Sequence, residues 1–254
     1  MIDLTTGRVV REFDRGVTGV SWVPVDCVRR EAKTLLIVPN RERVLDLVDL
    51  TDDRFVSDRA PRPQHERGRI DFSRVLISPR GGWIANDAFI YKHAGLPRVW
   101  SLDAWTHDPW EPEYGASARR LAQRWYHWGG EMCFVDETTF ALWGWGGDDE
   151  YLVPAAVLYD VRDGRLVRWF AGPRVRPVQA SSTRARDESM VFDEFLFAVH
   201  DELGTTVWDV ESGERLHTDE SLRPTRYHRA GKCFITLTTD GIRVSRLVRD
   251  EGSD

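Results

Sequence analysis

Lysine is scarce in a chain that is otherwise rich in charge. Of the 35 basic residues only Lys33, Lys92 and Lys232 are lysines, and all the others are arginines. This bias is typical of GC-rich bacterial genomes, so we expect a bacterial protein. Acidic residues outnumber basic ones and give a net charge of -6. That field does not attract polyanions, so nucleic acid and anionic membranes are not expected as partners.

Long apolar runs are also missing, and no stretch approaches the roughly 18 residues of a membrane-spanning helix. The first seven residues lack a basic region followed by an apolar stretch, so we expect no secretory signal. The three cysteines, Cys27, Cys133 and Cys233, are an odd number without close spacing. This favours reduced thiols in a cytoplasm over a disulfide framework.

Sequence motifs that identify an enzyme are absent as well. There is no Gly-x-Ser-x-Gly elbow, phosphate-binding loop, dinucleotide fingerprint or Cys-x-x-Cys pair. The acidic run Asp148-Asp149-Glu150 lacks the alternating ligand spacing of an EF-hand. The sequence therefore predicts no cofactor and no resident metal, and it identifies no reaction.

What the chain does contain is a repeat with a period of about 40–50 residues, which is typical of propellers and related arrays. Each copy reads as a short strand, a polar turn that ends in glycine, and a second strand. Glycine fits such turns because it adopts a positive φ without steric cost. The three copies are Ile2–Val10, Tyr159–Val167 and Trp208–Leu216.

A fourth segment, Ile77–Ala85, places a Ser-Pro-x-Gly turn between two apolar strands. Together with the aromatic-Asp-x-x-x-Gly units at Tyr159 and Trp208, it resembles the WD40 family. The structuring Gly-His pair of that family is absent, so the resemblance is to a divergent member. It implies an all-β propeller, and it implies that Tyr159 and Trp208 are structural residues that pack between neighbouring blades.

The strand patterns predict a single domain over residues 1–254, with about five four-stranded blades and six as the alternative. Residues 8–13 read as an outer strand, whereas the last blade lacks one. We therefore expect the two ends to pair and close the ring, which removes two exposed strand edges. The predicted strands are 17–23, 34–38, 44–50 and 55–58 for blade one, 74–77, 83–89, 98–102 and 121–125 for blade two, 132–135, 139–145, 156–161 and 165–170 for blade three, 178–182, 194–200, 206–210 and 214–218 for blade four, and 225–228, 232–238 and 242–248 for blade five.

In a propeller, the loops between the second and third strands and the loops between blades emerge on one face. This rim is the predicted binding site, because long loops on a rigid scaffold commonly carry function. Two of its loops, 90–97 and 146–154, are longer than a hairpin needs. The predicted site residues on the rim are aromatic, acidic or histidine: His93, Tyr126, His127, Trp128, Trp145, Asp148, Asp149, Glu150, His200, Asp201 and Glu202.

Eleven tryptophans require a large aromatic core or an aromatic binding surface. The aromatic insertion 105–114, after the third strand of blade two, fits either a cover for the blade or a partner site on the other face. The preferred function is a non-catalytic scaffold that binds a protein or peptide. The alternative is a propeller enzyme, or a binder of a small ligand or metal, with its site at the mouth of the central channel.

Overall fold

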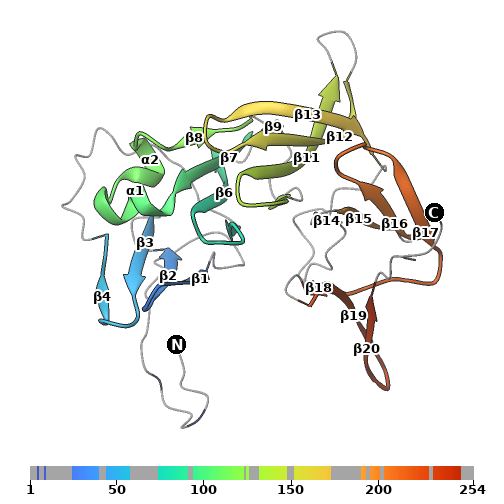
Figure 1. Ribbon diagram of the computed structural model, residues 1–254, viewed down its shortest axis with the longest axis horizontal. Coiled ribbons are helices and arrows are strands. Elements are labelled where there is room, and N and C mark those ends of the chain that lie inside the picture. Colours follow the sequence, from blue (N-terminus) through green and yellow to red (C-terminus); the bar gives the residue numbers. More distant parts are fainter. Residues whose placement is uncertain are drawn as a thin grey trace, which may run out of the picture. The chain divides into compact units, whose positions relative to one another are not determined.

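Strands form most of the structure (Figure 1). The computed structural model describes residues 5, 9, 25–39, 44–57, 74–90, 94–122, 124–125, 132–147, 152–172, 190–192, 195–200, 203–228 and 231–246. These residues form five antiparallel sheets in which consecutive strands are neighbours. Contacts divide the chain into two compact units, Met1–Gly129 with Asp160–Arg165 and Gly130–Tyr159 with Leu166–Asp254.

The first unit contains two sheets. Sheet one has the order β1-β2-β3-β4, and sheet two has the order β5-β6-β7-β8 with β9 also paired to β7. Two short helices lie between β7 and β8 in the sequence. The elements are β1 (Asp26–Arg30), β2 (Lys33–Pro39), β3 (Leu45–Asp49), β4 (Arg54–Phe55), β5 (Val75–Ile77), β6 (Trp83–Ile90), β7 (Ala94–Ser101), α1 (Leu102–His107), α2 (Glu111–Tyr114), β8 (Arg119–Arg120) and β9 (Arg124–Trp125).

The remaining sheets have the orders β10-β11-β12-β13, β14-β15-β16-β17 and β18-β19-β20. They belong to the second unit, except that the turn from β12 to β13 belongs to the first. The strands are β10 (Met132–Phe134), β11 (Thr139–Gly147), β12 (Leu152–Asp160), β13 (Arg165–Ala171), β14 (Met190–Phe192), β15 (Phe195–His200), β16 (Gly204–Asp209), β17 (Arg215–Asp219), β18 (Arg226–His228), β19 (Cys233–Thr238) and β20 (Gly241–Arg246).

Apolar side chains pack between successive sheets within each unit. In the first unit, Ile37 and Leu47 of sheet one pack with Ile84 and Trp100 of sheet two, and all four are fully buried. The opposite face of sheet one is buried too, through residues such as Val48. Burial on both faces explains why β2 reads Leu-Leu-Ile-Val instead of alternating with polar residues.

In the second unit, one core cluster joins sheets three and four and another joins sheets four and five. Trp208 packs against the first of these clusters, and its indole Nε1 donates to Thr206 Oγ1 at 3.2 Å. The structural role expected for Trp208 is therefore confirmed. Cys133 and Cys233 are buried free thiols, as expected, whereas Cys27 is exposed.

A recurrent side-chain hydrogen bond ends the third strand of sheets one to four. Asp49 Oδ1 accepts from the N–H of Thr51, Asp160 Oδ1 from that of Arg162, and Asp209 Oδ1 from that of Ser212. These are Asx turns, in which a short carboxylate replaces the backbone acceptor. In sheet two Ser101 holds the same place, and its hydroxyl caps helix α1 by accepting from Ala104 N–H.

The predictions for sheets two to five find most of the strands but misplace some of their ends. The predicted strand 121–125 overlaps β9 and misses β8, and β7 and β12 each begin four residues before the predicted 98–102 and 156–161. The first strand of sheet four also differs from its prediction. That strand is β14, described from Met190, whereas the predicted strand 178–182 lies outside the described residues, as does 17–23 of blade one. In blade one β1 pairs with β2 instead, from Asp26–Ile37 to Arg30–Lys33. The sequence does not predict this hairpin, because β1 is polar and its turn contains no glycine. Glu31 takes the place of a glycine in the turn, with a positive φ of 54°.

Sheet five has three strands among the residues that the structure describes. The outer strand predicted at 8–13 lies outside that part of the chain, apart from Val9. Closure of the ring by this segment therefore stays a prediction, as does the single domain over residues 1–254.

Candidate functional site

The predicted rim maps to the tips of three hairpins and one connection between blades. Trp145 lies in β11 and His200 lies in β15, where it pairs with Gly204. The side chains of these two residues lie outside the described part of the structure. The same is true of the other predicted site residues: His93, Tyr126, His127, Trp128, Asp148, Asp149, Glu150, Asp201 and Glu202.

The two long rim loops were predicted wrongly, because the strands extend into them. Strands β6 and β7 stay paired as far as Ile90 and Ala94, so three residues remain between them instead of the predicted loop 90–97. Strand β11 reaches Gly147 and β12 begins at Leu152, which shortens the loop 146–154 in the same way.

Pro97 shows why a proline fits here. It stands opposite Asp87, at the point where the outer partner of β7 changes from β9 to β8. Strand β9 pairs with Ala94 and Gly95, whereas β8 pairs with Arg98 and Val99. No ladder bond from the nitrogen of Pro97 is needed at this interruption, and proline lacks that donor.

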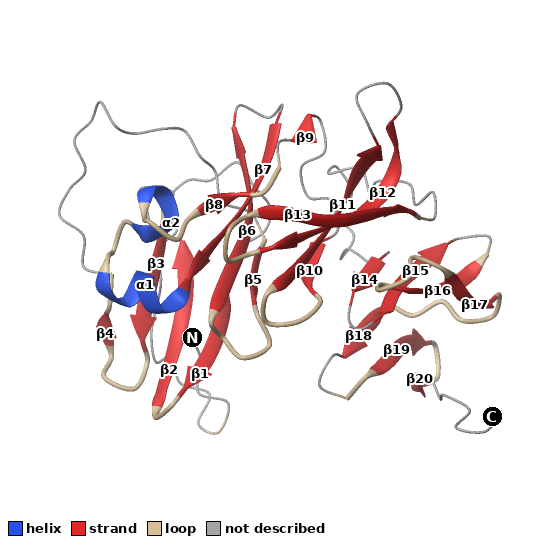
Figure 2. Cartoon of the chain, turned by 45° about the horizontal axis from the view of Figure 1, so that its top comes forward, coloured by secondary structure: helices blue, strands red, loops and turns tan. Residues whose placement is uncertain are grey.

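The aromatic insertion of blade two folds as the helices α1 and α2 (Figure 2). Trp105 is fully buried and meets Trp100 edge to face, with ring centroids 5.8 Å apart. Glu111 is also buried, and its Oε1 accepts from the N–H and the hydroxyl of Ser117. The insertion therefore covers the hydrophobic flank of sheet two, which was one of its two predicted roles.

Arg98 and Glu113 interact beneath this cover. Arg98 donates to the backbone oxygen of Glu113 at 2.8 Å, and burial lowers the pKa of Arg98, partly offset by the nearby Glu113 carboxylate. The side chains of Glu111 and Glu113 are both buried, so these two carboxylates belong to the cover of sheet two and not to its exposed surface.

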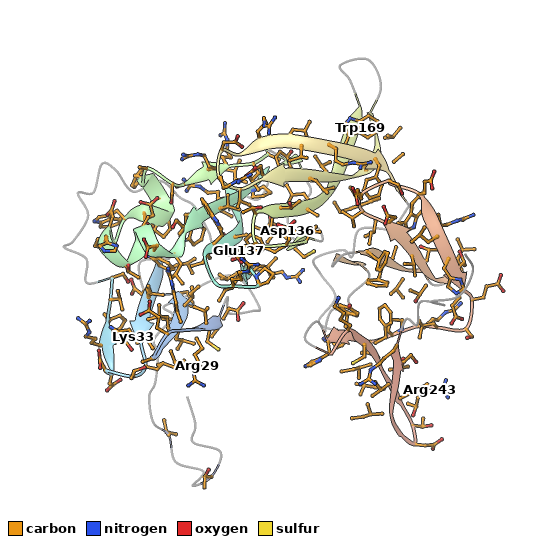
Figure 3. The ribbon with its side chains drawn as sticks, viewed as in Figure 1. Arg29, Lys33, Asp136, Glu137, Trp169 and Arg243 are labelled. Atoms are coloured by element: carbon orange, nitrogen blue, oxygen red, sulfur yellow. The ribbon has the colours of Figure 1, made fainter. Side chains whose placement is uncertain are left out.

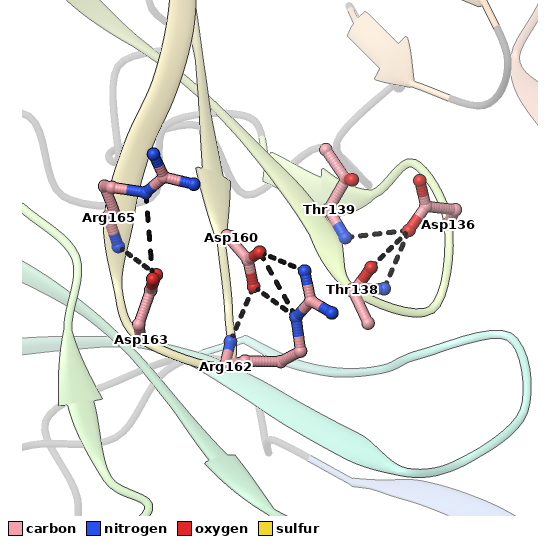
Figure 4. A network of polar contacts seen from close by, with 7 residues as sticks. All are labelled: Asp136, Thr138, Thr139, Asp160, Arg162, Asp163 and Arg165. Carbon is pink, nitrogen blue, oxygen red and sulfur yellow. Dashed lines mark hydrogen bonds and ion pairs between the residues drawn. The ribbon is translucent and has the colours of Figure 1, made fainter.

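Two carboxylates with lowered pKa values, Asp136 and Asp160, form turns (Figure 4). A hydrogen bond from the Arg162 side chain lowers the pKa of Asp160 to about 2. For Asp136, burial raises the pKa, but hydrogen bonds from Thr138 and Thr139 outweigh it and lower the pKa overall. The described residues contain no group of three or more His, Cys, Asp or Glu side chains placed to hold a metal ion. Within the described chain, no helix has the length and apolar character to cross a bilayer.

The outer strands of sheets one to four share a feature that the sequence reading did not identify. Each begins with arginine: Arg54 in β4, Arg119 in β8, Arg165 in β13 and Arg215 in β17. A charged side chain at a free strand edge hinders unwanted edge-to-edge pairing. Part of the arginine content therefore has a structural explanation.

Strand β13 also begins with arginine, but it is longer and more apolar than the other outer strands. It has seven residues, against two in β4 and β8 and five in β17. It exposes three large apolar side chains, Leu166 at 48%, Val167 at 51% and Trp169 at 39%. Figure 3 labels Trp169 on this strand. A long outer strand that exposes a tryptophan is the clearest candidate binding surface among the described residues.

The sequence predicts an outer strand at 165–170, but no residue of this strand is among the predicted site residues. The sequence feature that indicates a surface is Trp169, which lies on the face turned away from the core of its own sheet. Phe170, the next residue, is buried and packs into the cluster between sheets three and four. Because side chains alternate along a strand, Val167 and Trp169 share the face opposite to Phe170.

Comparison with known proteins gives a structural match without a sequence match. No protein-family model and no curated protein matches the sequence. The structure is similar to the β-propeller domain of Cps50 (Swd1) from Myceliophteria thermophila, with a TM-score of 0.50 and 14% identity. The match covers 94% of this chain and 69% of the other. The five antiparallel sheets and this match confirm the expected fold: the chain is an all-β protein, a β-propeller of five blades.

Proposed function

We propose that this propeller is a non-catalytic scaffold that binds another protein or a peptide. The observation that carries the proposal is the apolar outer strand β13 with its exposed Trp169. Exposed apolar surface that is contiguous on a soluble domain commonly marks an interaction site. Tryptophan is enriched among the residues that dominate binding energy at protein interfaces.

The exposure of β13 does not depend on an incomplete blade. Among the residues that the structure describes, sheet three has the four strands of a complete blade, and β13 is the last of them. Strand β20 also exposes apolar residues, Ile242 and Val244, but it is the third strand of its blade. The closure model gives that edge to residues 8–13. Strand β13 is thus the better candidate for contact with a partner.

The predicted rim provides a second surface in the same proposal. The acidic residues Asp148, Asp149 and Glu150 lie between β11 and β12 in the sequence. Three adjacent carboxylates favour a basic region of a partner. A bacterial cytoplasm as the location of the protein belongs to the proposal too, because it rests on composition alone.

The test is a reconstituted interaction. A partner captured from a lysate is identified, purified and titrated against the wild-type chain by calorimetry. Trp169→Ala should weaken binding by about tenfold or more, as truncating a hot-spot residue does. The matched control is Leu216→Ala, which removes a comparably exposed apolar side chain from β17. It should leave the affinity unchanged.

Two results would overturn the proposal. One is a purified partner whose affinity is the same for the wild type, for Trp169→Ala and for the triple alanine variant of Asp148, Asp149 and Glu150. The other is a metabolite or metal that raises the melting temperature and is converted or coordinated, with no protein partner recovered. That outcome would support the alternative function at the mouth of the channel.

A further inference from the structure

We infer that β13 binds an extended acidic peptide of a partner protein as an additional strand of sheet three. This inference rests on the proposed scaffold function and specifies its binding mode and the chemistry of the partner. On the face of Val167 and Trp169 the partner segment carries apolar residues, with a carboxylate on the same face opposite Arg165, and its backbone pairs with the outer edge of β13.

The first argument is the length of the edge. Seven residues at about 3.3 Å each give roughly 23 Å of strand, enough for several main-chain hydrogen bonds. Strand β13 is the last strand in its sheet order, so one side of its backbone faces away from β12. Peptides that add to a sheet edge gain affinity from main-chain bonds and specificity from alternate side chains. The two-residue edges of β4 and β8 are too short for this mode.

The second argument is the side-chain pattern of β13. Val167 and Trp169 are two residues apart and therefore share one face, where both are substantially exposed. On the other face, Phe170 is buried, and the Arg168 guanidinium lies over its ring at 5.8 Å. A partner strand beside β13 would place its apolar residues next to Val167 and Trp169 as diagonal or direct cross-strand neighbours.

The third argument is charge. Strand β13 contains two arginines and no carboxylate, in a protein with a net charge of -6. The side chain of Arg165 is 73% exposed, and its Nε lies 3.7 Å from Asp163 Oδ2. A guanidinium has five N–H donors, so this contact leaves capacity for a second carboxylate. Arg168 is directed inward and helps to lower the pKa of Asp209, so Arg165 is the residue that selects an acidic peptide.

The experiment uses the full chain and a synthetic seven-residue peptide, Glu-Thr-Val-Thr-Val-Thr-Glu, with blocked ends, which in either strand direction places valines opposite Val167 and Trp169 and a glutamate opposite Arg165. Its affinity is compared with that of the same peptide carrying lysine in place of glutamate. We expect the glutamate peptide to bind at least about tenfold more tightly. Arg165→Glu should reverse this preference. The control Arg215→Glu, at the first residue of β17, should leave it unchanged.

Strand addition has its own readout. Peptides methylated on alternate backbone nitrogens fall into two sets, because successive N–H groups of a strand point to opposite sides. One set should lose binding and the other should keep it. Hydrogen exchange of residues 166–171 should slow when the peptide binds, whereas exchange of 215–219 should not.

Four outcomes overturn the inference. Binding that tolerates methylation in both sets excludes strand addition, and equal binding of the lysine peptide excludes the charge argument. A dimer that dissociates with Trp169→Ala would show that a second copy occupies β13. If the peptide fails while a purified partner still depends on Trp169, strand addition is wrong and the scaffold function stands.

Discussion

Gly213 offers a direct measure of how tightly neighbouring sheets pack at their outer turns. It follows β16 with φ at 77°, a conformation that costs an L side chain about 1–2 kcal/mol. A Cβ built there would lie 2.8 Å from the Cβ of Phe170 and 2.9 Å from its Cγ. Phe170 is buried on the outer strand of the preceding sheet, so it has little freedom to move.

Gly164 holds the equivalent place in sheet three and provides the matched comparison. Its φ is 74°, so Gly164→Ala has the same backbone strain. A Cβ there would lie 3.2 Å from the Cβ of Arg119, a close contact, but with the stem of a half-buried and flexible side chain. We expect Gly164→Ala to lower the free energy of unfolding by about 1 kcal/mol.

Gly213→Ala should lower it by about 2–4 kcal/mol, because overpacking against a buried ring typically adds about 1–3 kcal/mol. The assay is urea unfolding followed by tryptophan fluorescence, with both variants and the wild type under the same conditions. Equal destabilisation by the two variants, or a larger effect of Gly164→Ala, would refute the argument that Phe170 closes the space beside Gly213.

Three further predictions concern the core, the turns and the chain ends. Trp105→Ala should reduce the free energy of unfolding by about 3–5 kcal/mol, measured by urea denaturation, because the side chain is fully buried against Trp100. The pKa of Asp160 falls from 3.8 unfolded to about 2 folded, so its contribution to stability is present above pH 3.8 and disappears as pH drops through 2. Asp160→Asn should flatten the melting-temperature profile between these values, and an unchanged profile would contradict the role of Arg162. Deletion of residues 1–13 should cause a large fall in melting temperature if that segment completes blade five; a truncated chain as stable as the parent would disprove the closure.

Much of the fold could be predicted from the sequence because its turns are short and chemically specific. The Asp-x-x-x-Gly units at Asp160 and Asp209 predict both the strands and the turn between them, and the structure contains both. Sheet one ends its third strand in the same way at Asp49, but Asp53, at φ 50°, replaces the glycine. With aspartate in place of glycine the turn no longer shows the Asp-x-x-x-Gly motif, although the backbone keeps a positive φ at this position.

The candidate site was harder to predict from the sequence. Polar residues indicate a loop, but apolar residues do not show whether their strand is buried or lies at an exposed edge. Loops were predicted at 90–97 and 146–154, yet the strands of both hairpins extend into these stretches. The apolar outer face of β13 has the same residue types as a buried strand. Its position at the end of the sheet order makes those residues accessible, and sequence alone does not determine whether a partner strand follows.

Ser101 has a consequence for the tolerance of the fold to added structure. At this position sheets one, three and four use aspartate to close a tight turn, whereas Ser101 starts a helix and the chain returns to β8 some 18 residues later. The pairing of β7 with β8 is retained despite the detour, and Ser117 Oγ accepts from the N–H of Ser101 where the chain comes back. A blade can therefore accept a foreign segment after its third strand without loss of its sheet. The equivalent turns at 161–164 and 210–214 are natural positions for grafting a tag, a reporter helix or a second binding module.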